Sequence, residues 1–154
     1  MPIADQVRDW LIRRKVRMHR APLDRFVVRV ARSTADYEHA FRLLHVADAF
    51  QGFEDLDAEQ LRITPQHVLP ESTVLVAYEA ERLVGTLTVT LDSPAGLPND
   101  RDYPEEMAAL RRAGATLVEF GSLAIVHRCW SSGVARLLEM AASYWSMRIL
   151  GATH

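Results

Sequence analysis

The sequence predicts one mixed α/β (α+β) domain, and two observations carry this prediction. Residues 73–78 and 83–91 have strand character and flank a short polar turn, as in a β-hairpin. Two further apolar strands, residues 26–31 and 116–126, are separated from the hairpin by segments with helical periodicity. A hairpin combined with a helical crossover is typical of a mixed sheet packed against helices. A chain of 154 residues is long enough to bury one sizeable core.

The first third of the chain predicts a helix, a strand and a second helix. Apolar residues recur at helical spacing in residues 3–18, which predicts an amphipathic helix. Residues 26–31 form the first strand. Ser33 or Thr34 is expected to cap the next helix, because a hydroxyl accepts a hydrogen bond from a free N–H group at a helix start. Gly52 is expected to end that helix or to follow its end closely.

The middle of the chain predicts a loop, the hairpin and a short helix. Residues 61–71 contain two prolines and are expected to form a structured loop. Leucine and valine alternate with threonine in residues 83–91, and Gly85 within this strand indicates a bulge or a close backbone approach. Pro104 suits the first position of a helix, and Gly114 suits its end.

The strand at residues 116–126 carries one carboxylate, Glu119, and leads through a polar turn into a helix expected to open with Ser131 and Ser132. A charge on such a strand costs free energy unless it is paired or used. A helix start offers free N–H groups and the positive end of a dipole, which hold phosphates. The combination suggests group transfer from a phosphate-bearing carrier.

Composition narrows the class of protein. Apolar residues make up 49% and charged residues 25%, as in ordinary globular proteins, and no apolar run is long enough to span a bilayer. The single Cys129 excludes an internal disulfide, and the six histidines lack ligand spacing, so no metal site is expected. We expect a cytoplasmic protein. Residues 1–32 hold nine basic and three acidic residues, a basic head on an acidic body.

Three separated segments resemble the GNAT acyltransferase superfamily and, within it, the long-chain N-acyl amino acid synthases, relatives of the acyl-homoserine lactone synthases. They are residues 62–72, residues 92–98 together with 103–106, and residues 119–125. The resemblance runs from about Phe26 to about Gly151. It implies a GNAT-like fold and an N-acyltransferase that moves a long-chain acyl group from acyl carrier protein to the amine of an amino acid.

The resemblance also implies a site in three parts. Glu119 would accept the proton of the attacking amine, while backbone N–H groups polarise the thioester carbonyl. The pantetheine arm of the acyl carrier would contact the strand and the following turn, at Leu123, Ala124, Ile125, Arg128, Ser131, Ser132, Gly133 and Val134. The acceptor amino acid would contact Arg62, His67 and Glu71.

The chain departs from the family pattern in four places. Trp130 stands where the superfamily's pyrophosphate motif has Gln or Arg, and Ser122 stands where homoserine lactone synthases have an arginine. Residues 44–48 stand where an Arg-rich stretch of the first helix is expected. The chain ends near His154, where another strand of a GNAT fold is expected to begin. We therefore expect a basic N-terminal helix in residues 1–22 and a GNAT-like domain in residues 23–154 that lacks its C-terminal closing strands.

Structural alternatives stand beside each functional role. Glu119 could be paired with an arginine in the core, the serines could simply cap a helix, and Arg62, His67 and Glu71 could only stabilise their loop. Cys129 could in principle act as a nucleophile, but attack by the amine needs none. For the whole chain, the alternatives are a CoA-dependent N-acetyltransferase and a non-catalytic GNAT-like binding module.

Partners and co-substrates follow from the same arguments. No permanently bound cofactor is expected, and acyl-phosphopantetheine on acyl carrier protein, or acyl-CoA, would be the co-substrate. The basic head suits acidic acyl carrier protein or, peripherally, a membrane. Nucleic acid is not expected, because no helix-turn-helix or RNA-binding signature occurs. An open sheet edge would leave room for a homodimer.

Overall fold

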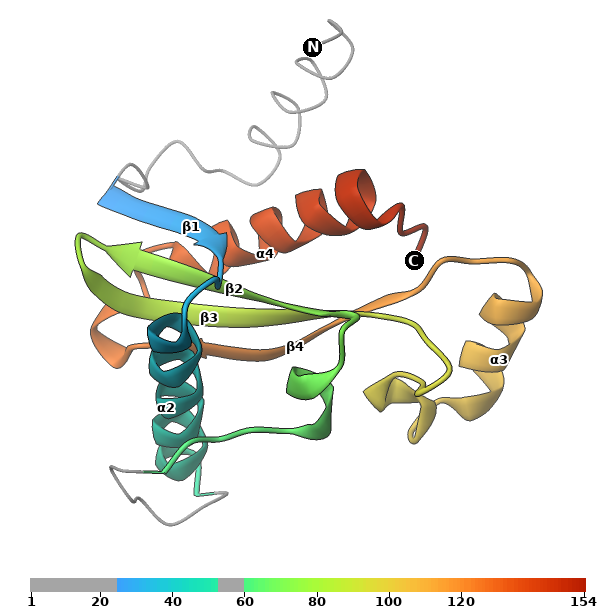
Figure 1. Ribbon diagram of the computed structural model, residues 1–154, viewed down its shortest axis with the longest axis horizontal. Helices are drawn as coiled ribbons and strands as arrows, with labels where there is room; N and C mark the ends of the chain where they lie inside the picture. Colours follow the sequence, from blue (N-terminus) through green and yellow to red (C-terminus); the bar gives the residue numbers. More distant parts are fainter. Residues whose placement is uncertain (1–24, 53–59) are drawn as a thin grey trace, which may run out of the picture.

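The structure, a computed structural model, describes residues 25–52 and 60–154. The predicted basic segment, residues 1–22, lies outside the described residues. Within them, three α-helices accompany one antiparallel sheet of four strands in the order β1-β2-β3-β4 (Figure 1). The strands are β1 (Phe26–Val30), β2 (Ser72–Glu79), β3 (Arg82–Leu91) and β4 (Val118–Ile125). The helices are α2 (Thr34–Phe50), α3 (Pro104–Arg112) and α4 (Val134–Trp145). The predicted mixed fold is confirmed.

Helices α2 and α4 cover opposite faces of the sheet (Figure 1). Successive side chains of a strand point to opposite faces. Val74 and Val76 of β2 therefore pack with α2, whereas Leu75 and Ala77 pack with α4. The sheet thus separates two apolar clusters, and β4, as one of its strands, contributes side chains to both.

Local capping explains where α2 begins. Ser33 is its N-cap, and its Oγ accepts the backbone N–H of Asp36 at 3.2 Å. The Asp36 carboxylate is 2% exposed and accepts a two-pronged hydrogen bond from Arg29 and another from the Tyr78 hydroxyl. The Arg29 guanidinium, helped by backbone N–H groups and Tyr78, holds the pKa of Asp36 well below its usual range against the opposing effect of burial. The predicted start at Ser33 or Thr34 is confirmed.

Gly85 satisfies both expectations for this position. The register between β2 and β3 shifts beside it, between Ala77 and Tyr78, which marks a bulge. A Cβ atom on Gly85 would lie 2.8 Å from Ile125 Cδ1 and 3.0 Å from Leu138 Cδ1. The absence of a side chain therefore lets β3 approach β4 and α4 closely.

The segment between β3 and β4 is not a crossover to a parallel strand. Helix α3 lies beyond the end of the sheet, and β4 returns antiparallel to β3 (Figure 1). For β4 to run parallel to β3, the connecting segment would have to cross a face of the sheet and return to the end where β3 starts. Helix α3 does not cover a face of the sheet (Figure 1), so β4 starts where β3 ends and runs antiparallel to it. Pro104 at the helix start and Gly114 just after its end, with φ at +77°, follow the prediction.

The last described residues return to β4. Thr153 N–H donates to Thr116 O at 2.9 Å, and Val118 N–H donates to His154 O at 3.0 Å. The His154 N–H also donates to Thr116 O at 3.3 Å, so the two backbone groups of His154 flank Leu117 in the pattern of parallel strands. Within the described residues, the rest of the outer edge of β4 has no strand beside it.

Candidate active site

Glu119 lies near the beginning of β4, opposite Thr90 of β3. One carboxylate oxygen, Oε2, accepts the backbone N–H of Asn99 at 2.9 Å. Within the described residues no Arg or Lys forms an ion pair with it, so the alternative of a core carboxylate held by an arginine is not what the structure contains.

Partial burial raises the pKa of Glu119 above its ordinary value. The Asn99 N–H opposes this shift by stabilising the carboxylate, and the negative charges of Asp100 and Asp102 add to it. A carboxylate with a raised pKa is a better proton acceptor at neutral pH than an ordinary surface glutamate. Glu119 therefore has the electrostatic setting of a general base.

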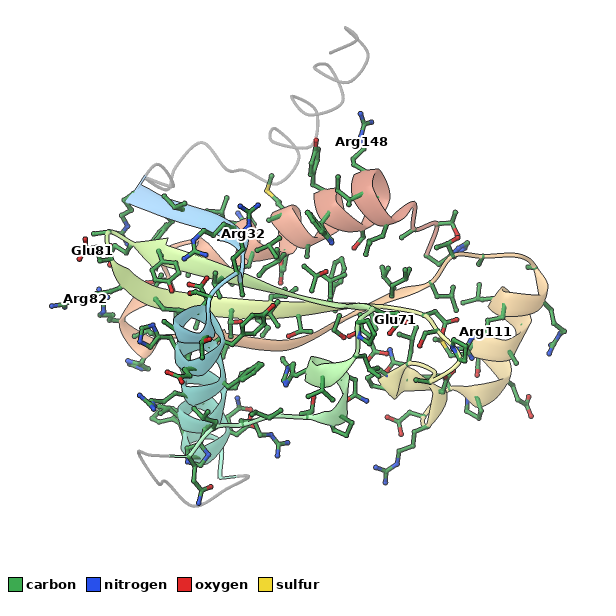
Figure 2. All side chains as sticks on the ribbon, in the orientation of Figure 1. Arg32, Glu71, Glu81, Arg82, Arg111 and Arg148 are labelled. Carbon is green, nitrogen blue, oxygen red and sulfur yellow. The ribbon has the colours of Figure 1, made fainter. Side chains whose placement is uncertain are left out.

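The loop that supplies Asn99 is fastened by Arg111 of α3. Its guanidinium donates to Asp92 at 2.6 and 2.7 Å and to Asp100 at 2.6 and 2.8 Å. The carboxylate of Asp100 also accepts the Leu97 N–H, and these bonds hold the pKa of Asp100 below its usual range, with Arg111 as the largest cause. Figure 2 shows Arg111 at the end of the molecule where α3 lies.

A β-bulge interrupts β4 after Glu119. The register jumps from the pair Thr88–Gly121 to the pair Thr86–Ala124, so β4 has one residue more than β3 in this interval. Ser122, inside the bulge, has φ at +51°, a conformation that is rare and strained for a non-glycine residue. Sequence reasoning did not foresee this bulge.

His67 reaches the bulge from the 3-10 turn η3 (Pro65–Val68). Its Nε2 lies 3.1 Å from Ser122 Oγ, and its Nδ1 accepts the Thr64 N–H at 3.0 Å. Burial, with a smaller contribution from nearby Arg62, lowers the pKa of His67 below its ordinary value. The ring is therefore neutral, and because Nδ1 is an acceptor the proton is on Nε2 and is donated to Ser122.

A pocket of about 1090 Å³ opens on the other side of the bulge, between α2, the β2–β3 turn and the end of β4. Its apolar wall comes from α2 and from the strands, through Leu43, Val46, Ala47, Phe50, Leu83, Leu123, Ile125 and Val126. Cationic and titratable side chains also line it, from Arg42, Arg82, Arg128, His39 and His127, with Glu81 as the one acid of the lining. Figure 2 shows Glu81 and Arg82 at the opposite end of the sheet from Arg111.

Three aromatic rings meet at the pocket. His127 and Trp130 have ring centroids 4.5 Å apart, and Phe50 lies 5.9 Å from each. Trp130 is 58% exposed, and its Nε1–H donates to Ile125 O at 3.0 Å. The residue that departs from the pyrophosphate motif therefore touches the strand predicted to bind the pantetheine arm.

Five of the eight residues predicted to bind the pantetheine arm fall into two groups. Leu123, Ile125 and Arg128 line the pocket, although Arg128 Nη1 is also 2.8 Å from Glu79 Oε2. Ala124 and Val134 have buried side chains packed in the core, so only their backbone atoms could face a ligand.

The expected helix start at Ser131 and Ser132 is wrong. Helix α4 begins at Val134, and Gly133 is its N-cap with φ at +87°. Ser132 Oγ donates to Cys129 O at 2.6 Å, which closes a turn ahead of the helix. Ser131, Ser132 and Gly133 thus belong to this turn, whose left-handed glycine places the start of α4 later than the serines suggest.

The three predicted acceptor residues are not brought together as one cluster. Arg62 Nε lies 3.0 Å from Asp48 Oδ2 of α2. Glu71 precedes β2, and its backbone carbonyl accepts the Leu91 N–H at 3.1 Å. His67 contacts the bulge instead. Among the contacts of the described residues, it is His67 that has a hydrogen bond to the strand that carries Glu119.

Sequence reasoning also missed the contribution of α2 to the pocket. The predicted core stripe of this helix contained Phe41 and Leu44, which are indeed buried. The helix has a second apolar stripe beside the core stripe, with the same three- and four-residue spacing but shifted by one position. It lines the pocket and consists of Leu43, Val46, Ala47 and Phe50. The sequence did contain a signal for this pocket, because the apolar stripe of α2 is wider than packing against the core requires.

The described residues offer neither a membrane-spanning helix nor a metal cluster. None of their helices combines the length and the apolar character that a bilayer crossing requires. They also contain no group of three or more His, Cys, Asp or Glu side chains arranged to hold a metal ion.

Comparison with known proteins identifies the family. A family model described as N-acyl amino acid synthase FeeM matches residues 39–154, most of the chain. The chain belongs to this family. The resemblance to N-acyl amino acid synthases predicted from the three segments is thereby confirmed.

The fold of this FeeM family member also matches a solved structure, that of FeeM, an N-acyl amino acid synthase from uncultured soil microbes. The TM-score is 0.65 at 26% sequence identity, over 79% of this chain and 65% of that protein. The chain therefore spans slightly less than two thirds of the length of that synthase. No curated protein matches the chain significantly. The predicted GNAT-like fold is confirmed by the structural match.

Proposed function

We propose that this chain is an N-acyltransferase that joins a long-chain acyl group, delivered as the thioester of acyl carrier protein, to the amine of an amino acid. Membership of the FeeM family supports the reaction class. The observation that carries the proposal is the arrangement along β4. A carboxylate with a raised pKa lies on one side of the bulge, and a large apolar pocket with a basic rim lies on the other.

The pocket suits a long apolar chain that ends in a charged carrier. Apolar walls remove methylene groups from water, which stabilises the complex in proportion to the chain length buried. The three arginines at the lining, Arg42, Arg82 and Arg128, favour a phosphate group and an acidic carrier protein. The acyl group would occupy the pocket, and its phosphopantetheine arm would pass the turn at Ser131–Gly133.

Glu119 would accept the proton of the acceptor amine. An amine attacks a thioester only when it is unprotonated, and a nearby carboxylate with a raised pKa takes the proton released as the new bond forms. Within the described residues the carboxylate has no cationic partner that would stabilise its charge, so proton uptake is not opposed by an ion pair.

Trp130 supports acyl carrier protein over CoA as the donor. The superfamily's pyrophosphate motif has Gln or Arg at this position, whereas an indole offers no charge to a pyrophosphate. The indole instead contacts His127 and Phe50 at the pocket. This environment suits an apolar acyl group with a single phosphate better than a nucleotide diphosphate.

Intact-mass spectrometry tests the proposal. The chain is incubated with long-chain acyl carrier protein and a pool of amino acids, and the carrier is expected to lose its acyl mass only when amino acids are present. Glu119→Gln should slow this loss by about 10²-fold or more, because a general base contributes about that factor. Glu139→Gln, an exposed carboxylate of α4, is the matched control and should keep the wild-type rate.

Two results would contradict the proposal. An unchanged acyl mass with folded wild-type protein would support the alternative of a binding module. Equal turnover with acyl-CoA and acyl carrier protein would support the CoA-dependent alternative.

A further inference from the structure

The β-bulge at Ser122 occupies the place where the two substrates must meet. Glu119, which would receive the amine proton, lies three residues before Ser122, about 10 Å along an extended strand. Leu123, which lines the pocket for the acyl chain, follows Ser122 directly. On the proposed function, the thioester carbonyl at the end of the acyl chain therefore lies close to the bulge.

The hydroxyl of Ser122 keeps its O–H free to donate a hydrogen bond, as the contacts of His67 show. Neutral His67 accepts the Thr64 N–H at Nδ1 and so must donate its Nε2–H to Ser122 Oγ. Ser122 therefore acts as an acceptor toward His67, and its own O–H has no acceptor among the described residues. The side chain is only partly buried, so a ligand can reach it.

The same geometry excludes a serine nucleophile. To activate Ser122, His67 would have to accept the hydroxyl proton at Nε2. That nitrogen already carries a proton, because Nδ1 is occupied as an acceptor from the Thr64 N–H. In this arrangement the Ser122 hydroxyl can donate a hydrogen bond to a ligand, but His67 cannot remove its proton.

The surroundings of the bulge indicate a ligand. Ser122 keeps a left-handed backbone that costs a non-glycine residue about 1–2 kcal/mol, and such strain gathers at functional sites. A Cβ added to the neighbouring Gly121 would meet nothing within 4 Å, so space is open beside the bulge. Opposite Gly121, the buried Thr88 Oγ1 has no hydrogen-bond partner in the part of the chain that the structure describes.

We propose that Ser122 is a second catalytic residue, whose hydroxyl donates a hydrogen bond to the thioester carbonyl oxygen, and that His67 positions it. This inference rests on the proposed function. In the step, the amine nitrogen bonds to the carbonyl carbon and the carbon–sulfur bond breaks, so the carrier leaves as its thiolate. The amine proton passes to Glu119, and Ser122 keeps its own proton while stabilising the negative charge that develops on the oxygen.

Steady-state kinetics of three variants test the roles. Ser122→Gly removes the hydroxyl but favours the positive φ, so the bulge is retained. We expect kcat to fall about 10²-fold, the effect of losing one side-chain donor to the oxyanion, with KM for the acyl carrier within about twofold of wild type. Ser143→Ala, which removes an exposed α4 hydroxyl bonded to Glu139 O, is the control and should leave kcat unchanged.

The positioning role of His67 gives a sharper test. His67→Gln can still donate to Ser122 Oγ through its amide and should keep most of kcat, whereas His67→Leu should lose it nearly as fully as Ser122→Gly. In the Ser122→Gly background, His67→Leu should cost almost nothing more, because its effect passes through the hydroxyl. A merely structural histidine would lower activity equally in both backgrounds.

The outcomes separate this inference from the function on which it rests. Wild-type kcat in folded Ser122→Gly, with Glu119→Gln inactive, would overturn the role of Ser122 and leave the proposed function intact. Additive losses for His67→Leu and Ser122→Gly would overturn the positioning role. Absence of turnover by the wild-type chain would overturn the proposed function and this inference with it. Thermal unfolding of each variant checks that it is folded.

Discussion

Val46→Trp should shorten the acyl chain that the protein accepts. Val46 lies on α2, lines the pocket and is 42% exposed, so the added indole enters the pocket without displacing the core. Each methylene group withheld from the apolar wall loses about 0.8 kcal/mol of burial, a factor of about four in kcat/KM. An indole that displaces about three methylenes therefore lowers kcat/KM about 60-fold for a chain that fills the pocket.

The assay compares kcat/KM for a series of acyl carrier protein thioesters from short to long chains. Wild type should favour the longer chains, whereas Val46→Trp should keep its activity on short ones, which do not reach the indole. Val27→Trp is the matched control, because Val27 is 60% exposed on β1 and does not line the pocket. An equal loss at every chain length, or no loss, would refute the assignment of this pocket to the acyl chain.

Two predictions concern stability. The folded-state pKa of Asp36 lies below its unfolded value, so its contribution is present above about pH 4 and is lost as pH falls through the folded pKa. Urea unfolding should show this loss in wild type but not in Asp36→Asn, which should cost about 2 kcal/mol at neutral pH because the charge-assisted hydrogen bonds from Arg29 and Tyr78 to the buried carboxylate are weakened. An unchanged acid profile would contradict the assignment. Gly85→Ala should cost about 1–3 kcal/mol, since its Cβ would press on Ile125 and Leu138, and a melting temperature equal to that of wild type would show that these side chains move aside freely.

Local signals made much of the fold predictable. The alternation of apolar and threonine residues in β3 marks a strand with two different faces, and Ser33 caps α2 through a bond to a residue only three positions away. Pro104 and Gly114 delimit α3 by backbone preferences that act within a single turn. Glu119 stands out because a lone carboxylate in an apolar strand is costly unless it has a use.

The rest of the site depends on contacts that leave no local pattern. His67 and Ser122 are 55 positions apart in the sequence, and nothing near either residue indicates the other. The left-handed backbone of Ser122 could not be anticipated, because serine is not a residue that favours it. The start of α4 was misplaced for a related reason. Ser132 Oγ donates to Cys129 O at 2.6 Å in the preceding turn and accepts the Val134 N–H only at 3.4 Å, so the helix begins at Val134 and not at the serines.

The hydrogen bond from Trp130 to the carbonyl of Ile125 lowers the apparent affinity of the strand edge for any extended ligand. A ligand amide that adds to this edge must first displace the indole, and one hydrogen bond of this kind is worth about 0.5–1.5 kcal/mol. The ligand binds only the fraction of free protein in which the indole has left the Ile125 carbonyl. The measured dissociation constant is therefore the intrinsic one divided by that fraction. A ligand whose acyl chain also contacts the displaced indole recovers part of that free energy, whereas a short acyl group does not. On the proposed function, the same tryptophan would therefore discriminate between acyl groups by their length before any chemistry takes place.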